Sequence, residues 1–179
     1  HTAMVLGHSP PTVVEAIKQA VGQGMGLGAA STLEAEAAEE IVNRFPSIEK
    51  VRYTGSGTES SLHATRMVRA FTGRPKIAKF EGAYHGSHDA LEISVAPDLT
   101  KAGPADSPIA VAPWPGMARG SEDQVVILPY GQRESVELIL REQKDDVAAV
   151  FFDGKAGIYD IDPDFARFLR ELTRELGMV

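Results

Sequence analysis

The sequence predicts an α/β protein in which a mostly parallel sheet carries helices on both faces. Short, β-prone apolar segments alternate along the chain with helical segments. The run Val147–Phe152 is apolar throughout, which is typical of a strand buried on both faces of a parallel sheet. The chain has 179 residues, of which 43% are hydrophobic and 24% charged. This composition is typical of a globular protein, and the length suits about one domain.

Charge and composition argue against several classes of protein. The net charge is −7 without any basic block, whereas binding to nucleic acids needs clustered Lys and Arg. No apolar run approaches the ~20 residues of a membrane span. Cysteine is absent, which excludes disulfides and thiolate ligands and fits a reducing cytoplasm. The start, "HTAMVLGHSPP", has no signal-peptide pattern and no initiator Met, so we expect a piece of a longer, cytoplasmic protein.

Two amphipathic helices are predicted near the start of the chain, over Pro10–Gly24 and Ser31–Phe45. Ser9 or Thr12 is expected to cap the first helix, which has prolines in its first turn. A Ser-x-x-Glu capping box opens the second helix, and Pro46 ends it. The apolar face of the first helix consists of Val13, Val14, Ile17, Ala20 and Val21. In the second helix we expect a buried stripe of Leu33, Ala37, Ile41 and Phe45.

Strands and helices then alternate. The predicted strands are Lys50–Thr54, Lys76–Phe80, Val125–Pro129 and Val147–Phe152, and the predicted helices are Thr58–Phe71, Arg133–Lys144 and Pro163–Leu176. The last helix has Asp162 as its cap and Gly177 just past its end, and its core-facing residues are Phe165, Phe168, Leu169, Leu172 and Leu176. Met178 and Val179 resemble the start of another strand. The segment Ala96–Gln124 is rich in Pro, Gly and Ser, which predicts a long irregular loop.

Three loops follow strand ends, at Thr54–Thr58, Glu81–Asp89 and Asp153–Gly157. In open parallel sheets, ligands bind outside the carboxyl ends of the strands. We therefore expect these loops to form the site.

The segment "TGSGTE" places two glycines and two hydroxyls between a predicted strand and a predicted helix. A helix N-terminus stabilises an anion through its unpaired N–H groups and its dipole. Gly55 and Gly57 permit close backbone approach, and Ser56 and Thr58 add hydroxyl donors. The segment matches neither a P-loop nor the dinucleotide fingerprint. Two interpretations stay open: a capped turn, or a seat for a phosphate group.

A second polar segment, "YHGSHD", offers Tyr84, His85, His88 and Asp89. Two histidines and an aspartate can form a metal site, although their spacing is loose and no further ligand is evident, so we expect no metal. A polar loop with capping side chains is the second interpretation. The third is an aromatic ring and an imidazole that cover a planar ligand.

Taken in order, "LGHSPPTVVEAI", "STLEAEAAEEIVNRFPSIEKVRYTGSGTES", "RAFTGRPKIAKFEGAYHGSHDA" and "ILPY" resemble the class III, fold-type I pyridoxal-phosphate aminotransferases, nearest to the glutamate-1-semialdehyde aminomutase branch. The resemblance implies pyridoxal 5'-phosphate as cofactor. It implies that Ser56, Gly57 and Thr58 hold the cofactor phosphate. It also implies that Tyr84 stacks on the pyridine ring and that His85 lies near that ring.

The resemblance further implies amino transfer to or from a small-molecule amine or amino acid, by Schiff-base exchange and a 1,3-proton shift, in a homodimer. Intramolecular transfer, as in an aminomutase, is the named alternative. A non-catalytic remnant that keeps the phosphate seat is another, and an unrelated α/β phosphate binder is a weaker one. By resemblance, residues 1–48 are the N-terminal helical segment of the large domain, and residues 49–179 are an incomplete cofactor-binding α/β part of it.

Two departures from the family pattern matter. The Asp that pairs with the pyridine nitrogen and the Lys that forms the Schiff base have no match in this chain, so its catalytic residues are unknown. Where the family has a Glu-Pro loop after the buried strand, this chain has "FFDGKAG". Asp153 is expected to take the place of that Glu in cofactor binding. Lys155 does not match the position of the family's catalytic Lys.

Overall fold

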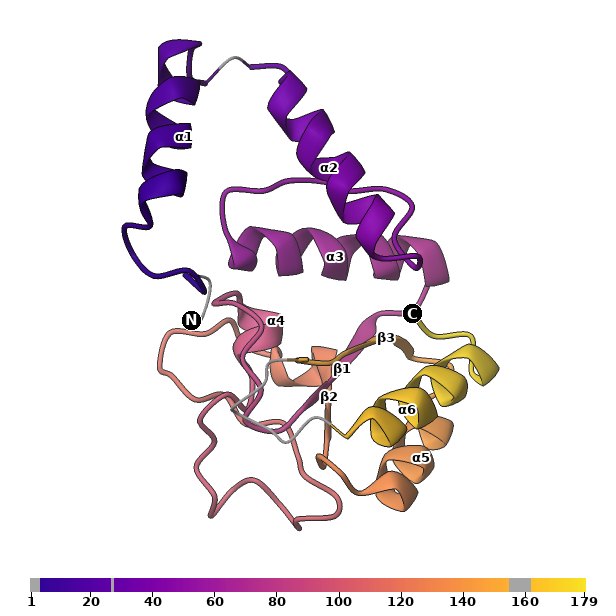
Figure 1. Ribbon diagram of the computed structural model, residues 1–179. Coiled ribbons are helices and arrows are strands. Elements are labelled where there is room, and N and C mark those ends of the chain that lie inside the picture. Colours follow the sequence, from indigo (N-terminus) through magenta and orange to yellow (C-terminus); the bar gives the residue numbers. More distant parts are fainter. Residues whose placement is uncertain (1–3, 27, 155–161) are drawn as a thin grey trace. The chain divides into compact units, whose positions relative to one another are not determined.

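The computed structural model describes residues 4–26, 28–154 and 162–179 (Figure 1). The chain forms two compact units, His1–Tyr53 and Thr54–Val179. The predicted division of the family's large domain at residue 48 stays a prediction. Among the described helices, none combines the length and the apolar character that crossing a membrane requires.

The N-terminal unit holds two helices, α1 (Pro11–Gly22) and α2 (Thr32–Arg44). The residue before α1 is Pro10, and no side chain caps this helix. The expected cap by Ser9 or Thr12 is therefore wrong; a proline at the first position lacks an N–H and leaves one donor fewer to satisfy. In α2 the capping box is confirmed: the Ser31 hydroxyl accepts from the Glu34 N–H at 3.2 Å, and the Glu34 carboxylate accepts from the Ser31 N–H at 2.8 Å.

Neither helix of the N-terminal unit contains a buried residue. Leu33 and Phe45, which were expected in a buried stripe, are 52% and 54% exposed. That expectation is wrong for this unit, because an apolar helix face is buried only where another element packs against it. The strand expected at Lys50–Thr54 does not form either. A strand needs a hydrogen-bonded neighbour, and none of the described strands pairs with this segment.

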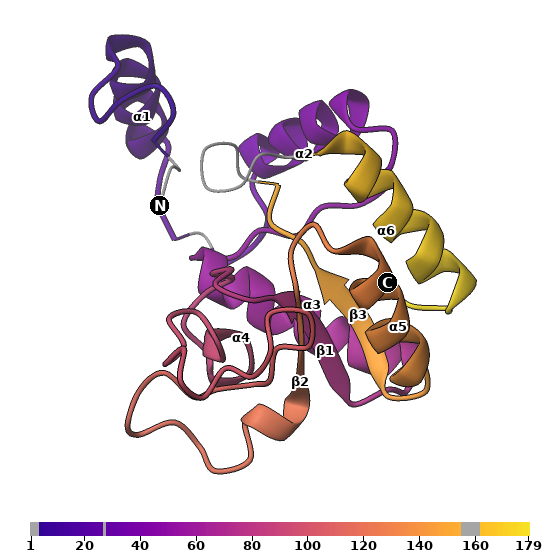
Figure 2. The same ribbon diagram turned by 90° about the horizontal axis from the view of Figure 1, so that it is seen from below.

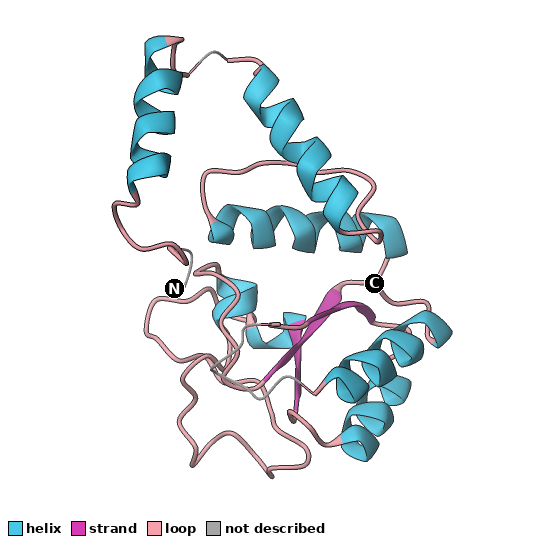
Figure 3. Ribbon diagram, in the orientation of Figure 1, coloured by secondary structure: helices cyan, strands magenta, loops and turns pink. Residues whose placement is uncertain are grey.

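The C-terminal unit is built on a sheet of three parallel strands (Figure 3). They are β1 (Lys76–Phe80), β2 (Val125–Leu128) and β3 (Val147–Phe151), in the order β2-β1-β3. Phe80 pairs with Leu128 of β2, and Ala78 pairs with Val150 of β3. At the C-terminus, the Val179 N–H donates to the Ala148 carbonyl, and the Val179 carbonyl accepts from the Val150 N–H, both at 3.0 Å. Val179 thus continues the parallel ladder beside β3, as the predicted next strand requires.

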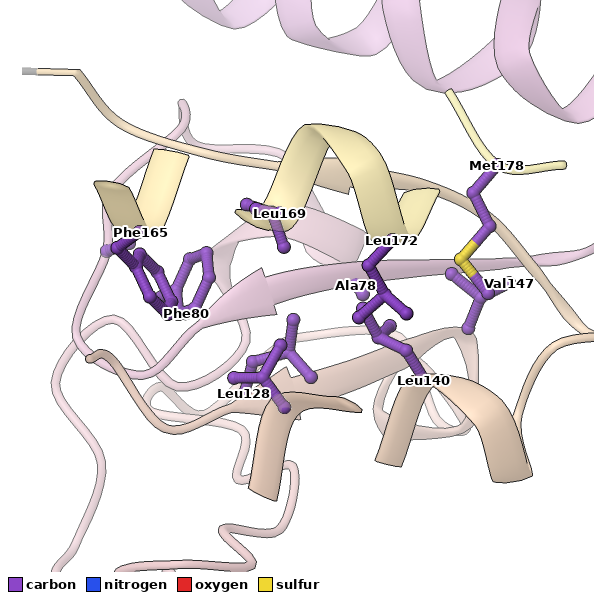
Figure 4. Close-up of a cluster of buried hydrophobic side chains, with 11 residues drawn as sticks. Ala78, Phe80, Leu128, Leu140, Val147, Phe165, Leu169, Leu172 and Met178 are labelled. Carbon is purple, nitrogen blue, oxygen red and sulfur yellow. The ribbon is translucent and has the colours of Figure 1, made fainter. Parts of the chain in front are cut away.

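One face of the sheet is covered by α5 (Arg133–Glu142) and α6 (Pro163–Glu175), which lie side by side (Figures 1 and 2). The core on this face is shown in Figure 4. Its buried residues include Ala78, Phe80, Leu128, Val136, Leu140, Phe165, Leu169 and Leu172. The Asp162 carboxylate accepts from the Asp164 N–H at 2.9 Å and caps α6, as predicted.

The opposite face carries α3 (Gly57–Thr72) and the short helix α4 (Asp89–Glu92). Ile77, Leu91, Ala148 and Ala149 form its buried cluster, and the partly buried Val68 of α3 packs against them. Helix α3 ends at Gly73, which has a φ of 74° and takes the left-handed conformation that favours glycine. The predicted parallel sheet with helices on both faces is confirmed. The long loop after α4 is irregular as expected until the 3-10 turn Glu122–Gln124.

Candidate functional site

Helix α3 begins at Gly57, directly after the "TGS" segment. Ser56 caps it: the Ser56 hydroxyl oxygen accepts from the Glu59 N–H at 3.2 Å. The Glu59 carboxylate turns back and accepts from the Gly55 N–H at 2.6 Å. The N–H groups of Gly57 and Thr58 lie at the first two helical positions, where no intrahelical acceptor exists. This terminus therefore presents two backbone donors and the proton of the Ser56 hydroxyl.

The loop that follows β1 meets this helix terminus. The Ser87 N–H donates to the Thr58 hydroxyl oxygen at 3.1 Å. Next to it, Gly86 has a φ of 104°, and a Cβ at this position would lie 2.8 Å from both the Thr58 Cα and the Ser61 hydroxyl oxygen. Position 86 therefore requires a glycine, both because the α3 backbone lies so close and because φ is positive. Two segments singled out in the sequence form one junction here, through residues that are 29 positions apart.

Tyr84 lies two residues before this junction and is 38% exposed. Its hydroxyl is 2.9 Å from the Ser87 hydroxyl. The backbone before it turns at Gly82, and Ala83 is buried beside Phe80. Tyr84 thus lies on a segment that is held on one side by the buried Ala83 and on the other by the contacts of Gly86 and Ser87 with Thr58.

His85 is a partly buried residue of the loop. Its ring meets the Phe151 ring edge-on at 5.6 Å, and its Nε2 is buried without a hydrogen-bond partner among the described residues. Burial is the main cause that lowers the pKa of His85 to about 4, and the Lys79 charge lowers it further, whereas the Asp153 carboxylate raises it. At neutral pH the His85 side chain is therefore an uncharged imidazole.

Asp153 follows β3 and is close enough to act on the charge of His85. The structure therefore brings Asp153, His85 and the α3 terminus to the carboxyl side of the sheet, as the sequence predicts for such folds. From Lys155 onward, the third loop lies outside the described residues.

The second half of "YHGSHD" has a structural role. The His88 carbonyl accepts from the Leu91 and Glu92 N–H groups at the start of α4. The Asp89 carboxylate accepts from the Ala118 N–H at 3.1 Å and ties the long loop to α4. Across residues 4–26, 28–154 and 162–179, no three His, Cys, Asp or Glu side chains converge as metal ligands would.

Sequence reasoning missed three contributors to this site. Gly86 and Ser87 make the junction with α3, and Lys79 lies buried under the loop. A lysine within the predicted strand Lys76–Phe80 was a visible signal for the third, because a charged residue in a core strand is almost never fully buried unless it is paired.

Comparison with known proteins gives the family. The class-III aminotransferase family model matches residues 1–179. A glutamate-1-semialdehyde 2,1-aminomutase of Desulfitobacterium hafniense is 40% identical over 177 residues, which are 97% of this chain and 40% of that protein.

Two solved structures are similar in fold. An omega-transaminase from Sphaerobacter thermophilus has a TM-score of 0.90 at 37% identity, covering 99% of this chain and 41% of that one. A transaminase with PLP bound has a TM-score of 0.82 at 35% identity, covering 97% of this chain and 40% of that one. The chain thus spans about 40% of the length of these relatives. On the family match, the sequence identity and the fold, this chain belongs to the class III aminotransferases.

Proposed function

We propose that the protein containing this chain is a pyridoxal 5'-phosphate-dependent aminotransferase. The observation that carries the proposal is the junction of Thr58 with Gly86 and Ser87, which joins an anion-binding helix terminus to the loop that bears Tyr84 and His85. The family and the neighbour solved with PLP bound support the same cofactor.

The donor set suits a phosphate group. The α3 terminus offers the N–H groups of Gly57 and Thr58, the Ser56 hydroxyl and the positive end of the helix dipole. A Cβ added at Gly57 would meet nothing within 4 Å, so this position leaves open space for a ligand. The Glu59 carboxylate accepts a hydrogen bond from the Gly55 N–H. This bond directs the carboxylate to the backbone of the turn.

The remaining residues suit a planar ring. We assign Tyr84 to stacking on it and the uncharged His85 to its vicinity. The buried Nε2 of His85, which has no partner among the described residues, can accept or donate one hydrogen bond to a polar group of the ligand. We assign Asp153, whose carboxylate raises the pKa of His85, to the cofactor site as well.

The cofactor, when bound, supplies the electron sink that amino transfer requires. The residues of this chain bind the phosphate and orient the ring. The reactive Lys and the Asp at the pyridine nitrogen are expected in the part of the relatives that this chain does not span. We propose a small-molecule amine or amino acid as substrate, a homodimer as the assembly and the cytoplasm as the location. An aminomutase is the second candidate, because a relative 40% identical to this chain bears that name.

The phosphate seat is tested in the full-length protein by replacing Ser56 and Thr58 together with Ala. Each hydroxyl donates a charge-assisted hydrogen bond to phosphate in the proposal, so the pair should weaken cofactor binding by about 2–4 kcal/mol. Titration of the apoprotein with pyridoxal phosphate, followed by absorbance, measures this. Thr72→Ala, at the other end of α3, is the matched control. Unchanged affinity in the double variant would refute the seat.

Ring stacking is tested by Tyr84→Ala with Tyr84→Phe as control. Loss of the ring should weaken cofactor binding by about 1 kcal/mol, while Phe keeps the ring and loses the contact with the Ser87 hydroxyl. Equal affinities for all three proteins would remove Tyr84 from the site.

Activity assays separate the remaining candidates. An aminotransferase needs an amino donor and a separate carbonyl acceptor, whereas an aminomutase converts one substrate without a second. Cofactor binding without either reaction would identify a non-catalytic remnant. Tighter binding of a nucleotide or a sugar phosphate than of pyridoxal phosphate would identify an unrelated phosphate binder.

A further inference from the structure

Lys79 lies in the central strand β1 and is fully buried, with 0% of its surface exposed. Its ammonium donates to the Leu91 carbonyl at 3.0 Å and to the Ile93 carbonyl at 2.7 Å. A buried charge costs free energy unless hydrogen bonds compensate it. Burial lowers the pKa of Lys79 to about 8, with the nearby Glu92 carboxylate acting in the opposite direction. The ammonium therefore stays mostly charged at neutral pH, and an apolar residue would avoid this cost.

The two carbonyls that Lys79 binds mark the end of the loop after β1. The next residue, Ser94, is fully buried and has a φ of 54°, in the left-handed region that costs a non-glycine residue free energy. Its carbonyl accepts from the Gly82 N–H at 2.8 Å, so the start and the end of the loop are joined.

Ser94 is also held from the other side. Its N–H donates to the Val111 carbonyl at 2.8 Å, and its hydroxyl accepts from the Val111 N–H at 3.0 Å. The hydrogen bonds of Lys79, Gly82 and Ser94 thus hold together the two ends of the loop formed by residues 83–93. Between these ends, the loop carries Tyr84 and His85, and the Ser87 N–H donates to the Thr58 hydroxyl oxygen on α3.

We propose that Lys79 is a positioning residue for the cofactor site: by binding the Leu91 and Ile93 carbonyls, it holds the Tyr84–Ser87 segment against the N-terminus of α3. The proposal rests on the proposed function for its effect on cofactor, but the positioning itself is a property of the protein alone. Without the ammonium, the buried carbonyls of Leu91 and Ile93 lose their donor, and the end of the loop is no longer held to β1.

A purely structural role for Lys79 gives a different expectation. In that case its loss lowers stability as any core substitution does, without a preferred effect on the loop. Val136→Ala is the matched control, because Val136 is also fully buried but packs on the opposite face of the sheet with α5 and α6.

The first measurement is amide hydrogen exchange on the cofactor-free, full-length protein. Lys79→Met keeps the length of the stem and removes the donors. We expect the Gly82 and Ser87 amides to exchange at least 10-fold faster in this variant and no more than 2-fold faster in Val136→Ala. Equal acceleration in the two variants overturns the proposal.

The second measurement is the dissociation constant of pyridoxal phosphate, at a temperature where both variants remain folded by circular dichroism. We expect at least 10-fold weaker binding for Lys79→Met and less than 2-fold for Val136→Ala. In a Thr58→Val background, where the link to Ser87 is already removed, Lys79→Met should weaken binding by less than 3-fold. Independent, multiplying effects overturn the proposal.

Two further arms keep the outcomes separate. If Lys79→Met does not fold, Lys79→Gln takes its place: the amide keeps a donor without the charge, and we expect exchange rates between those of the native protein and a fully opened loop. If the native protein does not bind pyridoxal phosphate, the proposed function fails. The exchange experiment still decides whether Lys79 positions the loop.

Discussion

The two units of this chain contain helices of similar length but differ in how those helices are stabilised. Helices α1 and α2 of the N-terminal unit have no buried residue, and Ile17 and Leu33 are 56% and 52% exposed. In the C-terminal unit, α5 and α6 bury Val136, Leu140 and Phe165 against the sheet. The sequence of both units carries an amphipathic helical pattern, which is stronger in α5 and α6 than in α1 and α2. The difference shows that an amphipathic pattern specifies a helix, while burial depends on a partner surface.

The largest test of this comparison is a pair of substitutions in the 179-residue chain. Phe80 is 1% exposed. The centroid of its ring lies within 5.7 Å of the ring centroids of Tyr130, Phe152 and Phe165. Phe80→Ala should lower the free energy of unfolding by about 3–5 kcal/mol through lost burial and a cavity. Ile17→Ala should lower it by less than about 0.5 kcal/mol. Denaturant unfolding measures both.

A large loss for Ile17→Ala in this chain would break the comparison. The same pair in the full-length protein sharpens it. If the additional chain or a second subunit covers α1, the cost of Ile17→Ala should rise there, while the cost of Phe80→Ala stays the same.

The second test uses pH, which acts on buried ionisable groups. The pKa of His85 is lowered to about 4 from an ordinary 6.5, mainly by burial. Between these values the unfolded chain binds the proton and the folded protein does not, so stability is present above pH 6.5 and falls as the pH drops towards 4. The loss should reach about 2–3 kcal/mol. Denaturant unfolding from pH 7 to pH 4 measures it.

The control for this test is His85→Gln, which removes the titrating group. The variant should lose less stability than the native protein over the same pH interval. Identical pH profiles for the two proteins would show that burial does not hold the imidazole in its uncharged form.

The smallest test compares the helix caps, which are local in both units. Ser31→Ala removes the capping box of α2, and Asp162→Ala removes the cap of α6. Each should cost its helix about 1 kcal/mol. Loss of helical circular dichroism should be larger for Ser31→Ala, because α2 has no buried residue to compensate. A larger loss for Asp162→Ala would contradict this difference.

The sequence by itself determined the elements whose signals are local. The capping box at Ser31, the cap at Asp162, the glycine end of α3 and the apolar run of β3 each act within a few residues. The strand predicted at Lys50–Thr54 did not form, because its local β-prone signal is not enough for a strand. A β-prone segment lacks a strand's hydrogen bonds until another strand pairs with it.

The tertiary structure alone decided how these elements form a site. Thr58 and Ser87 are 29 residues apart in the chain and meet through one hydrogen bond. Lys79 and Ser94 take their roles only because β1 and the end of the loop pack together. Local propensity specifies which residues begin a helix or a strand. Contacts between distant segments depend on packing and close approach, which no short stretch of sequence contains.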